Sequence, residues 1–557
     1  MASSAGARAE TDRRVERKDA LVITASSVGT VFEWYDFYLY GSLVSFITAH
    51  IFSALDPNSG FIVALLAFAA GFAVRPFGAL LFGRLGDLWG RKNTFLITML
   101  LMGLSTFGVA FLPDAKTPGI GFLSPWLLIG MRLVQGLALG GEYGGAATYV
   151  AEHAPPGKRG LYTSWIQTTA TFGLFLSLAV VMIVQAEMGE TAFADTGWRW
   201  PFAISLLLLL VSLWIRLQLN ESPVFQRMVD EGKASKRPLL DSFGRGRNLW
   251  LVVTALLGLT AGQAVVWYTG QFYALFFLNK TLKVDSFTAN ALVATALVLA
   301  TPFFIFFGWL SDRIGRKWII LLGCLIAAGS YQPLFKLLTQ AANPDLSRAV
   351  AASPVTVYAD QKECSFQFDP VGKAVFDSSC DVAKGYLVKA GVPYRSVAAP
   401  AGTLAKVTIG PTAIDSVAGD KMAKRAFKAA NEAWGKRVGA ALKAAGYPAK
   451  ADPARIDRPV VVGVLFALVL LVTMVYGPIA AMLAEMFPTR VRYTSMSLPY
   501  HIGNGWFGGF LPSIAFAMVA ATGDIFYGLW YPIVIAATTV VIGAVFVRET
   551  KDNDIHA

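Results

Sequence analysis

The sequence predicts an all-α membrane protein of twelve transmembrane helices in two similar six-helix bundles, with a small α/β domain inserted between the ninth and tenth helices. Three observations lead to this fold class. The 557-residue chain is 55% hydrophobic and 15% charged, with a mean hydropathy of +0.53, which lies outside the range of soluble globular proteins. It contains twelve apolar stretches long enough to cross a bilayer. A charged motif also occurs twice, once in each half.

The apolar stretches set the predicted domain boundaries. They lie at residues 22–51, 61–83, 94–112, 126–151, 161–186, 199–219, 249–278, 287–310, 318–340, 459–486, 494–521 and 525–547. The predicted parts are a cytoplasmic tail (1–20), the N-terminal bundle (21–219), a cytoplasmic middle loop (220–247), helices seven to nine (248–340), an insertion (341–458), helices ten to twelve (459–548) and a second cytoplasmic tail (549–557).

Lysine and arginine residues gather in the loops on one side of the predicted helices. These clusters include Arg13 to Lys18, Arg84 to Lys92, Lys158 and Arg159, Arg227 to Arg247, Arg313 to Lys317, and Arg548 to Lys551. The positive-inside rule places these loops, and therefore both termini, in the cytoplasm. The net charge of +12 thus reflects orientation in a lipid bilayer, and we expect no nucleic-acid partner.

The insertion at 341–458 is polar and would face away from the cytoplasm. Residues 419–446 carry apolar side chains at helical spacing, whereas 355–368 and 404–409 resemble strands. Cys364 and Cys380 both lie here, in an oxidising compartment, which favours a disulfide over two buried free thiols. The insertion contains no histidine and no spacing typical of metal sites. We therefore expect neither a bound metal nor an enzyme.

The repeated motif predicts a cytoplasmic gate. Gly-Arg-Leu-Gly-Asp-Leu-Trp-Gly-Arg-Lys, from Gly83 to Lys92, returns as Gly-Trp-Leu-Ser-Asp-Arg-Ile-Gly-Arg-Lys, from Gly308 to Lys317. Its glycines permit close approach of helices. The expected gate residues are Asp87, Arg91, Glu152, Asp312, Arg316 and Glu485, with Glu152 and Glu485 pairing with Arg91, Arg316 or neighbouring cations. The alternative is simple anchoring at the cytoplasmic surface.

Five ionisable residues within predicted spans of the first half have apolar or uncharged counterparts in the second half: Glu33, Asp36, Arg75, Arg132 and Glu142. Charged side chains facing lipid are costly, so these are expected to face inward and pair. Three acids and two bases leave one acid in excess, and an unpaired buried carboxyl is suited to bind a proton. Glu33, Asp36, Arg132 and Glu142 are therefore candidates for proton coupling. The alternative is a structural role in joining helices.

Other polar and aromatic residues in the spans are candidates to bind a substrate in a central cavity. Arg75 has the geometry to hold a carboxylate. The remaining candidates are Tyr143, Gln167, Gln263, Trp267, Gln271, His501 and Asn504. The alternative for each is a buried core position, with its polar groups hydrogen-bonded within the protein.

Together these residues resemble the major facilitator superfamily, and within it the metabolite:proton symporter family, which includes transporters of 2-oxoglutarate, citrate, shikimate and proline/betaine. The resemblance rests on Glu33-Trp-Tyr-Asp-Phe, Arg75-Pro-Phe-Gly, the repeated motif, Arg132-Leu-Val-Gln-Gly, Gly140-Gly-Glu-Tyr-Gly-Gly and Ala484-Glu-Met-Phe-Pro-Thr-Arg-Val-Arg-Tyr. It implies the major facilitator fold and secondary active uptake across the bacterial inner membrane, driven by protons, with Arg132 linked to coupling. The long insertion departs from shorter members of the family.

The expected function is proton-coupled symport of small organic acids (mono-, di- or tricarboxylates) by alternating access, in a monomer that uses no cofactor other than the proton. An alternative is a carrier of zwitterionic osmolytes such as proline or betaine, held by aromatic rings such as Trp267 and Tyr268. A third possibility is a transporter-like membrane sensor whose outer domain binds a ligand.

Overall fold

A computed structural model describes residues 27, 30–32, 34–44, 46–53, 57–217, 221–244, 246–365, 376–420 and 422–555. The first helix includes residues 34–44 and 46–51. The other long helices of the N-terminal lobe are α2 (Pro57–Trp89), α3 (Arg91–Val109), α4 (Ser124–His153), α5 (Arg159–Met188) and α7 (Trp200–Leu217). The short α6 (Glu190–Asp195) precedes α7, and α8 (Pro223–Asp230) and α9 (Pro238–Phe243) form the middle loop.

The C-terminal lobe contains helices with π-helical turns. Residues Gly246–Thr281 form one helix, in which α10 (Gly246–Ala255), α11 (Ala261–Tyr268) and α12 (Ala274–Phe276) are joined by π turns. The single helices are α13 (Ser286–Ile314), α14 (Lys317–Ala342) and α22 (Trp530–Phe546). Two further pairs follow each other closely: α18 (Arg458–Tyr476) with α19 (Ile479–Met486), and α20 (Arg492–Ile502) with α21 (Leu511–Thr522). Such π turns are frequent at functional sites.

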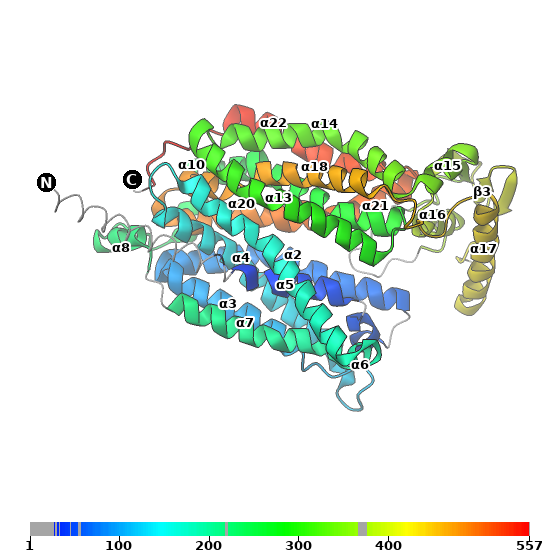
Figure 1. The fold of residues 1–557 in the computed structure, drawn as a ribbon, viewed down its shortest axis with the longest axis horizontal. Coiled ribbons are helices and arrows are strands. Elements are labelled where there is room, and N and C mark those ends of the chain that lie inside the picture. Colours follow the sequence, from blue (N-terminus) through cyan, green and yellow to red (C-terminus); the bar gives the residue numbers. More distant parts are fainter. Residues whose placement is uncertain are drawn as a thin grey trace.

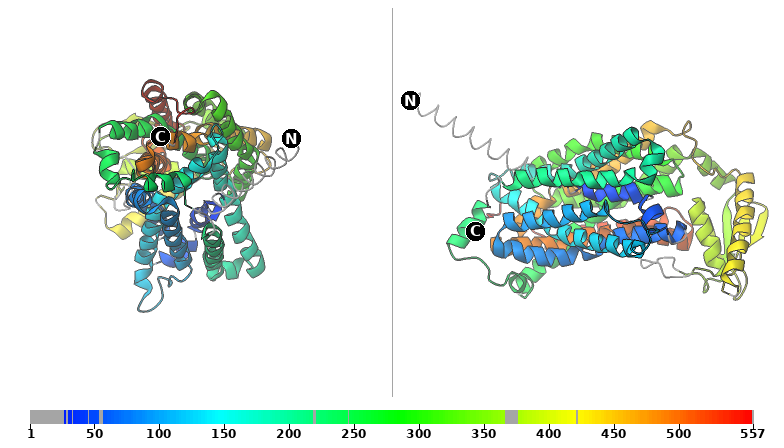
Figure 2. Two further views of the ribbon diagram at one scale, coloured as in Figure 1. Left: turned by 90° about the vertical axis from the view of Figure 1, so that its left-hand side faces the viewer. Right: turned by 90° about the horizontal axis from the view of Figure 1, so that it is seen from below.

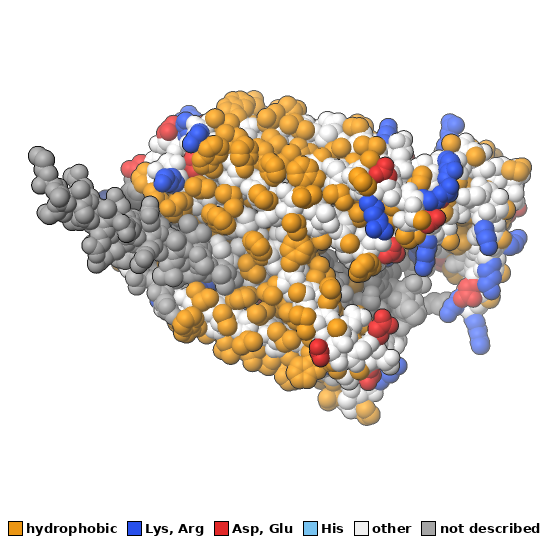
Figure 3. Space-filling model, in the orientation of Figure 1, with side chains coloured by type: hydrophobic (Ala, Val, Ile, Leu, Met, Phe, Trp, Pro, Cys, Tyr) orange, Lys and Arg blue, Asp and Glu red, His pale blue; other side chains and the backbone are white. Residues whose placement is uncertain are grey.

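Within the described residues, ten helices are long and apolar enough to cross a membrane. The two lobes are separate bundles that face each other (Figures 1 and 2). On the outer face of the bundles, hydrophobic side chains cover the middle, while charged side chains gather toward the ends and on the small domain (Figure 3). This distribution suits a helix bundle solvated by lipid around its middle and by water at its ends.

Glycines bring the lobes into close contact, and two of them, Gly86 and Gly308, belong to the repeated motif. A Cβ atom added to Gly308 on α13 would lie 2.4 Å from Cβ of Ser164 on α5, and one added to Gly160 would lie 2.4 Å from the carbonyl oxygen of Gly308. On the other side of the interface, a Cβ on Gly86 of α2 would lie 2.0 Å from the Tyr493 ring of α20. The interface therefore requires glycine at these positions.

The inserted domain contains a mixed four-stranded sheet. Its elements are α15 (Pro344–Ala352), β1 (Val355–Ala359), α16 (Ser379–Ala390), β2 (Tyr394–Ala398), β3 (Lys406–Ile409), β4 (Thr412–Asp415) and α17 (Lys424–Ala444). The strand order is β2-β1-β3-β4, with β1 parallel to β2 and antiparallel to β3. Buried Trp434, Val438 and Leu442 of α17 belong to the core of the domain.

The sequence predicted only part of this domain. The helix predicted at 419–446 is α17, and the strand predicted at 404–409 is β3. The strand predicted at 355–368 was too long, because β1 ends at Ala359 and Asp360 accepts backbone hydrogen bonds in the turn that follows; residues 366–368 lie outside the described part. The sequence analysis missed β2 and β4.

The domain is fixed to the C-terminal lobe, at the end opposite to α8 and the described C-terminal residues (Figure 1). The backbone N–H of Tyr394 donates to the carbonyl of Gly523 (3.0 Å), after α21. The Lys384 ammonium donates to the carbonyl of Ala521 (3.1 Å). The backbone N–H of Ala451 donates to the backbone carbonyl of Lys283 (3.0 Å).

Candidate functional site

A cavity lies between the two lobes. Its volume is about 30 Å³, which is enough for water molecules in this conformation. Its lining combines residues of the first helix, α2 and α4 with residues of the Gly246–Thr281 helix, α18, α20 and the π turn Gly503–Gly508: Thr30, Trp34, Phe37, Arg75, Leu139, Tyr143, Trp267, Tyr268, Tyr476, Tyr500, His501 and Asn504. A largely aromatic cavity with a few polar groups is typical of a small-molecule site.

Arg75 places its guanidinium in this cavity. The side chain is 8% exposed, and its central carbon lies 4.5 Å from the Phe72 ring centroid and 5.5 Å from that of Phe37. Its Nε atom is buried without a hydrogen-bond partner among the described residues. The rings hold the guanidinium in place by cation–π contacts and leave N–H groups to bind an acceptor.

A stack of tyrosines joins the lobes across the cavity. The rings of Tyr143 and Tyr500 are parallel within 4°, with centroids 3.6 Å apart. The hydroxyls of Tyr500 and Tyr476 are 2.8 Å apart, and Gln167 Nε2 donates to the Tyr143 hydroxyl (2.8 Å). Since Tyr143 is in the N-terminal lobe and the other two tyrosines are in the C-terminal lobe, movement between the lobes must separate this stack.

The predicted substrate-binding residues fall into two groups. Arg75, Tyr143, Trp267, His501 and Asn504 line the cavity, and both ring nitrogens of His501 lack partners within the described part of the chain. The remaining three predicted residues are not among the lining side chains: Gln167, Gln263 and Gln271. Gln263 exchanges amide hydrogen bonds with Asn504 (3.1 and 3.3 Å), so it orients a lining residue. Tyr476 and Tyr500 lie in the lining but outside the predicted set.

The aspartates of the repeated motif reach across the interface. Asp87 Oδ2 accepts from the backbone N–H and the hydroxyl of Thr494 (2.9 and 2.6 Å), at the start of α20. Asp312 accepts from the N–H groups of Gly160 and Leu161 (both 2.8 Å), at the start of α5. A carboxylate at a helix N-terminus is stabilised by the free N–H groups and by the helix dipole. Each lobe therefore caps a helix of the other.

Two buried glutamates add ion pairs across the same interface. Glu152 lies 2.8 Å from the Arg492 guanidinium of the opposite lobe and 3.8 Å from Arg91. Glu485 lies 2.7 Å from Arg316 and 3.4 Å from Arg159 of the opposite lobe. The sequence identified Arg91 and Arg316 by their place in the motif. For the inter-lobe partners, the sequence predicted only that neighbouring cations would pair with these glutamates. The fold identifies those cations as Arg492 and Arg159.

A second pair of glutamates, which the sequence analysis missed, binds the backbone of the repeated motif. Glu221 accepts from the N–H groups of Arg91 and Lys92 (3.1 and 3.2 Å), and Glu549 accepts from those of Arg316 and Lys317 (both 3.0 Å). Burial raises the pKa of Glu549, but the backbone N–H donors outweigh burial and hold that pKa below its ordinary value. The signal was present in the sequence, because Glu221-Ser and Glu549-Thr follow the sixth and twelfth predicted helices.

Comparison with known proteins identifies the family. The family model "Sugar (and other) transporter" matches residues 21–242 and 443–556, and "MFS/sugar transport protein" matches residues 148–355. The alpha-ketoglutarate permease of Escherichia coli K12 is 36% identical over 333 residues, which are 59% of this chain and 74% of the permease. The chain belongs to the major facilitator superfamily. Within it, the relatives place the chain in the metabolite:proton symporter family, whose members are transporters and not enzymes.

A second relative and a solved structure show how much of the chain is similar to known proteins. The proline/betaine transporter of Escherichia coli K12 is 35% identical over 323 residues, which are 57% of this chain and 64% of that transporter's length. A structure of the proton:xylose symporter XylE superposes with a TM-score of 0.65 at 16% identity, covering 97% of this chain and 98% of that one. At this low identity, the similarity to XylE shows the major facilitator fold alone.

In this facilitator three of the four predicted proton-coupling residues, Asp36, Arg132 and Glu142, are buried in the N-terminal lobe and do not line the central cavity. Asp36 is 7% exposed and lines a small space with residues of α3 and α7, including Met102 and Ser212. It interacts with Thr106, which accepts from Gln135, and Gln135 in turn accepts from Arg132. Polar side chains thus connect Asp36 to Arg132. Glu33 lies outside the described residues.

The excess of one acid expected from the sequence is wrong. Glu142 lies 3.4 Å from the guanidinium of Arg216, which is 2% exposed and packs over the Phe95 ring. Arg216 is a third inward-facing base, near the end of the last apolar stretch of the first half, and the count of two bases omitted it. Among the described residues of this lobe, two buried acids, Asp36 and Glu142, therefore occur with three buried bases, Arg75, Arg132 and Arg216.

Proposed function

We propose that this facilitator is a proton-coupled symporter that imports a small carboxylate-bearing solute across the bacterial inner membrane by alternating access. Twelve spans, with both termini in the cytoplasm and the inserted domain in the periplasm, are consistent with ten candidate spans, the first helix and α2. The position of the domain opposite to α8 supports this orientation (Figure 1).

The observation that carries the proposal is the charge of the cavity. Among the described lining residues, Arg75 alone carries a permanent charge, and its guanidinium is surrounded by rings. A cation with free N–H groups in a low-dielectric cavity favours an anionic partner, and a carboxylate can accept two parallel hydrogen bonds from it. Asn504 and His501 add polar groups that can orient the rest of the solute.

The aromatic walls support a second candidate, a zwitterion such as betaine. Trp34 and Trp267 lie with ring centroids 5.5 Å apart, and Trp267 lies 4.8 Å from Tyr268 and 6.2 Å from Tyr476. Faces of tryptophan and tyrosine attract quaternary ammonium groups. In this case Arg75 would still bind the carboxylate, and the rings would bind the cationic end.

Asp36 is our candidate proton carrier, with Arg132 as the base that resets it. Polar contacts through Gln135 and Thr106 connect the two. Because this chain of contacts lies behind the cavity, coupling would operate through movement of the first helix and not through direct contact of proton and substrate. The cytoplasmic gate of Asp87, Arg91, Glu152, Asp312, Arg316 and Glu485 would open and close the inner entrance.

Uptake by the purified protein in proteoliposomes tests the proposal. We expect accumulation of a carboxylate from a panel of organic acids and betaines, driven by an imposed inward proton gradient. Arg75→Gln should lower apparent affinity for that solute by about 10- to 100-fold, because hydrogen bonds to charged groups contribute about 1.5–3 kcal/mol. Arg84→Gln, at an exposed position on the same helix, is the control. Uptake that is indifferent to Arg75, or to the gradient, would refute this function.

A further inference from the structure

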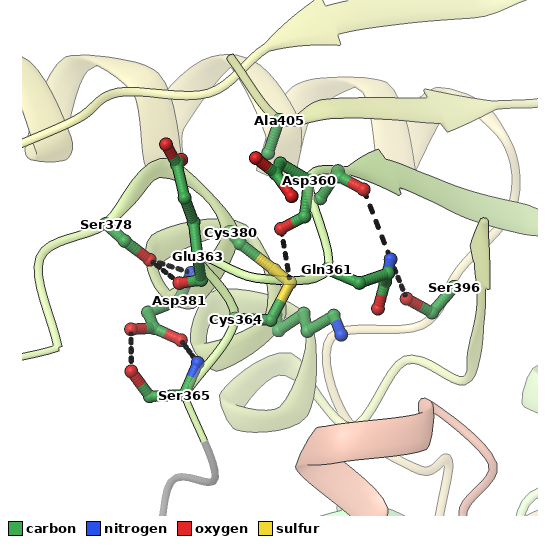
Figure 4. Close-up of a disulfide and its surroundings, with 12 residues drawn as sticks. Asp360, Gln361, Glu363, Cys364, Ser365, Ser378, Cys380, Asp381, Ser396 and Ala405 are labelled. Carbon is green, nitrogen blue, oxygen red and sulfur yellow. Dashed lines mark hydrogen bonds between the residues drawn. A yellow bond between two sulfur atoms is a disulfide. The ribbon is translucent and has the colours of Figure 1, made fainter. Parts of the chain in front are cut away.

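The inserted domain holds a disulfide at the start of a helix that connects two parallel strands. Cys364 follows β1, and Cys380 lies in the first turn of α16, which leads to β2 (Figure 4). Thioredoxin-like dithiol oxidoreductases also carry a cysteine at the start of a helix in a βαβ unit, as part of a Cys-x-x-Cys motif. Here the two cysteines are 16 residues apart in sequence. They therefore form no Cys-x-x-Cys motif by which the sequence could have indicated this arrangement.

The two sulfurs differ in their surroundings. Cys380 is 1% exposed, whereas Cys364 is half-buried. Cys364 is therefore the more accessible residue of the pair to an incoming thiolate. Attack on Cys364 expels Cys380 as a thiolate, and the dipole at the start of α16 stabilises that negative charge. A sulfur whose thiolate is stabilised is the better leaving group, so both exposure and position favour attack at Cys364.

The chain beside Cys364 is held close to α16 by bonds other than the disulfide. The backbone N–H and hydroxyl of Ser365 both donate to the Asp381 carboxylate (2.8 Å each), and the Ser378 hydroxyl donates to the carbonyl of Glu363 (2.8 Å) (Figure 4). The carbonyl oxygen of Asp360 lies 3.3 Å from Cys364 Sγ and can accept from that sulfur once it is protonated. The opened pair would therefore stay in position to close again.

We propose that Cys364–Cys380 is a thiol–disulfide exchange site that accepts two electrons from external thiols. In the first step a thiolate forms a bond to Cys364 Sγ, the Cys364–Cys380 bond breaks, and Cys380 leaves with the electron pair and takes up a proton. In the second step another thiolate attacks the external sulfur of the mixed disulfide and releases Cys364. The domain gains two thiols, and two thiol molecules become one disulfide. This activity is independent of the proposed transport.

Exchange with glutathione tests the site in the full-length chain, with Cys324→Ala removing the remaining cysteine, which is buried in α14. Reduced glutathione is added, the reaction is stopped with an alkylating reagent, and the adducts are located by mass spectrometry. We expect glutathione on Cys364, the alkyl group on Cys380, and a rate of opening at least equal to that of the unfolded chain. An adduct on Cys380, or a folded chain that opens more slowly than the unfolded one, would identify a structural disulfide and overturn the proposal.

Two variants separate exchange from a structural role. Cys380→Ser should accumulate the glutathione adduct on Cys364 when oxidised glutathione is supplied, because nothing remains to displace it. Asp381→Asn should slow reclosure of the reduced pair by about tenfold, since Ser365 loses a charged acceptor, while Asp415→Asn, on β4 of the same domain, should not. If Asp381→Asn recloses as fast as the parent, the bonds beside Cys364 do not position it and that part of the proposal fails.

Discussion

Removing one inter-lobe ion pair should open the cytoplasmic gate. In Arg492→Gln, Glu152 loses a partner at 2.8 Å while both groups are buried, with side chains 2% and 0% exposed. Truncating one member of a buried, hydrogen-bonded charge pair costs about 2–5 kcal/mol. Because Arg91 remains 3.8 Å from Glu152, we expect the lower end, about 2 kcal/mol. The ratio of closed to open molecules should then fall by about 30-fold.

Electron–electron distance measurements between spin labels can report this change. Labels at Lys158→Cys and Arg313→Cys, both exposed and on opposite lobes near the gate, should show a longer distance population in Arg492→Gln than in the parent. Arg490→Gln is the matched control, since Arg490 lies two positions earlier and makes no ion pair with the described residues.

A double-mutant cycle checks the physical cause. If Arg492 acts through Glu152, then Glu152→Gln combined with Arg492→Gln should shift the populations by less than the sum of the two single changes. An unchanged distance distribution in Arg492→Gln, or additive effects in the double variant, would refute the assignment of this pair to the gate.

Three further outcomes are expected. Asp36→Asn should retain exchange of substrate across proteoliposome membranes but lose accumulation driven by the proton gradient; equal loss of both would indicate damage to the fold. Gly308→Ala should destabilise the closed lobe contact and lower the unfolding temperature, because its new Cβ would lie 2.4 Å from Ser164 Cβ, whereas Gly463→Ala, with open space around it, should not. The Glu549 cap should depend on pH: its pKa is lowered in the folded state, so its contribution is present above its ordinary pKa of about 4.3 and is lost as the pH falls through the lowered value. The difference in unfolding temperature between the protein and Glu549→Gln should therefore be largest near pH 7 and shrink below about pH 4.

The amino-acid sequence alone was enough to predict the membrane fold class, and it also led to the proposal of a cytoplasmic gate. Apolar length and the distribution of basic residues are local quantities, because a bilayer imposes the same requirement on every span. The repeat pointed to the inter-lobe contacts proposed as a gate, since Asp87 and Asp312 occupy equivalent positions in the two halves. The sequence also predicted that the charged side chains within the spans face the interior, because a charged side chain that faces lipid is costly.

The partners of the buried charged side chains became known from the packing of the helices. The pairs Glu142–Arg216 and Glu152–Arg492 join residues 74 and 340 positions apart, and no local pattern connects them. The structure also separated Asp36 from the cavity that contains Arg75, although both belong to the same lobe. Which face of a helix meets which neighbour depends on how the bundle packs, and that packing is set jointly by all the helices.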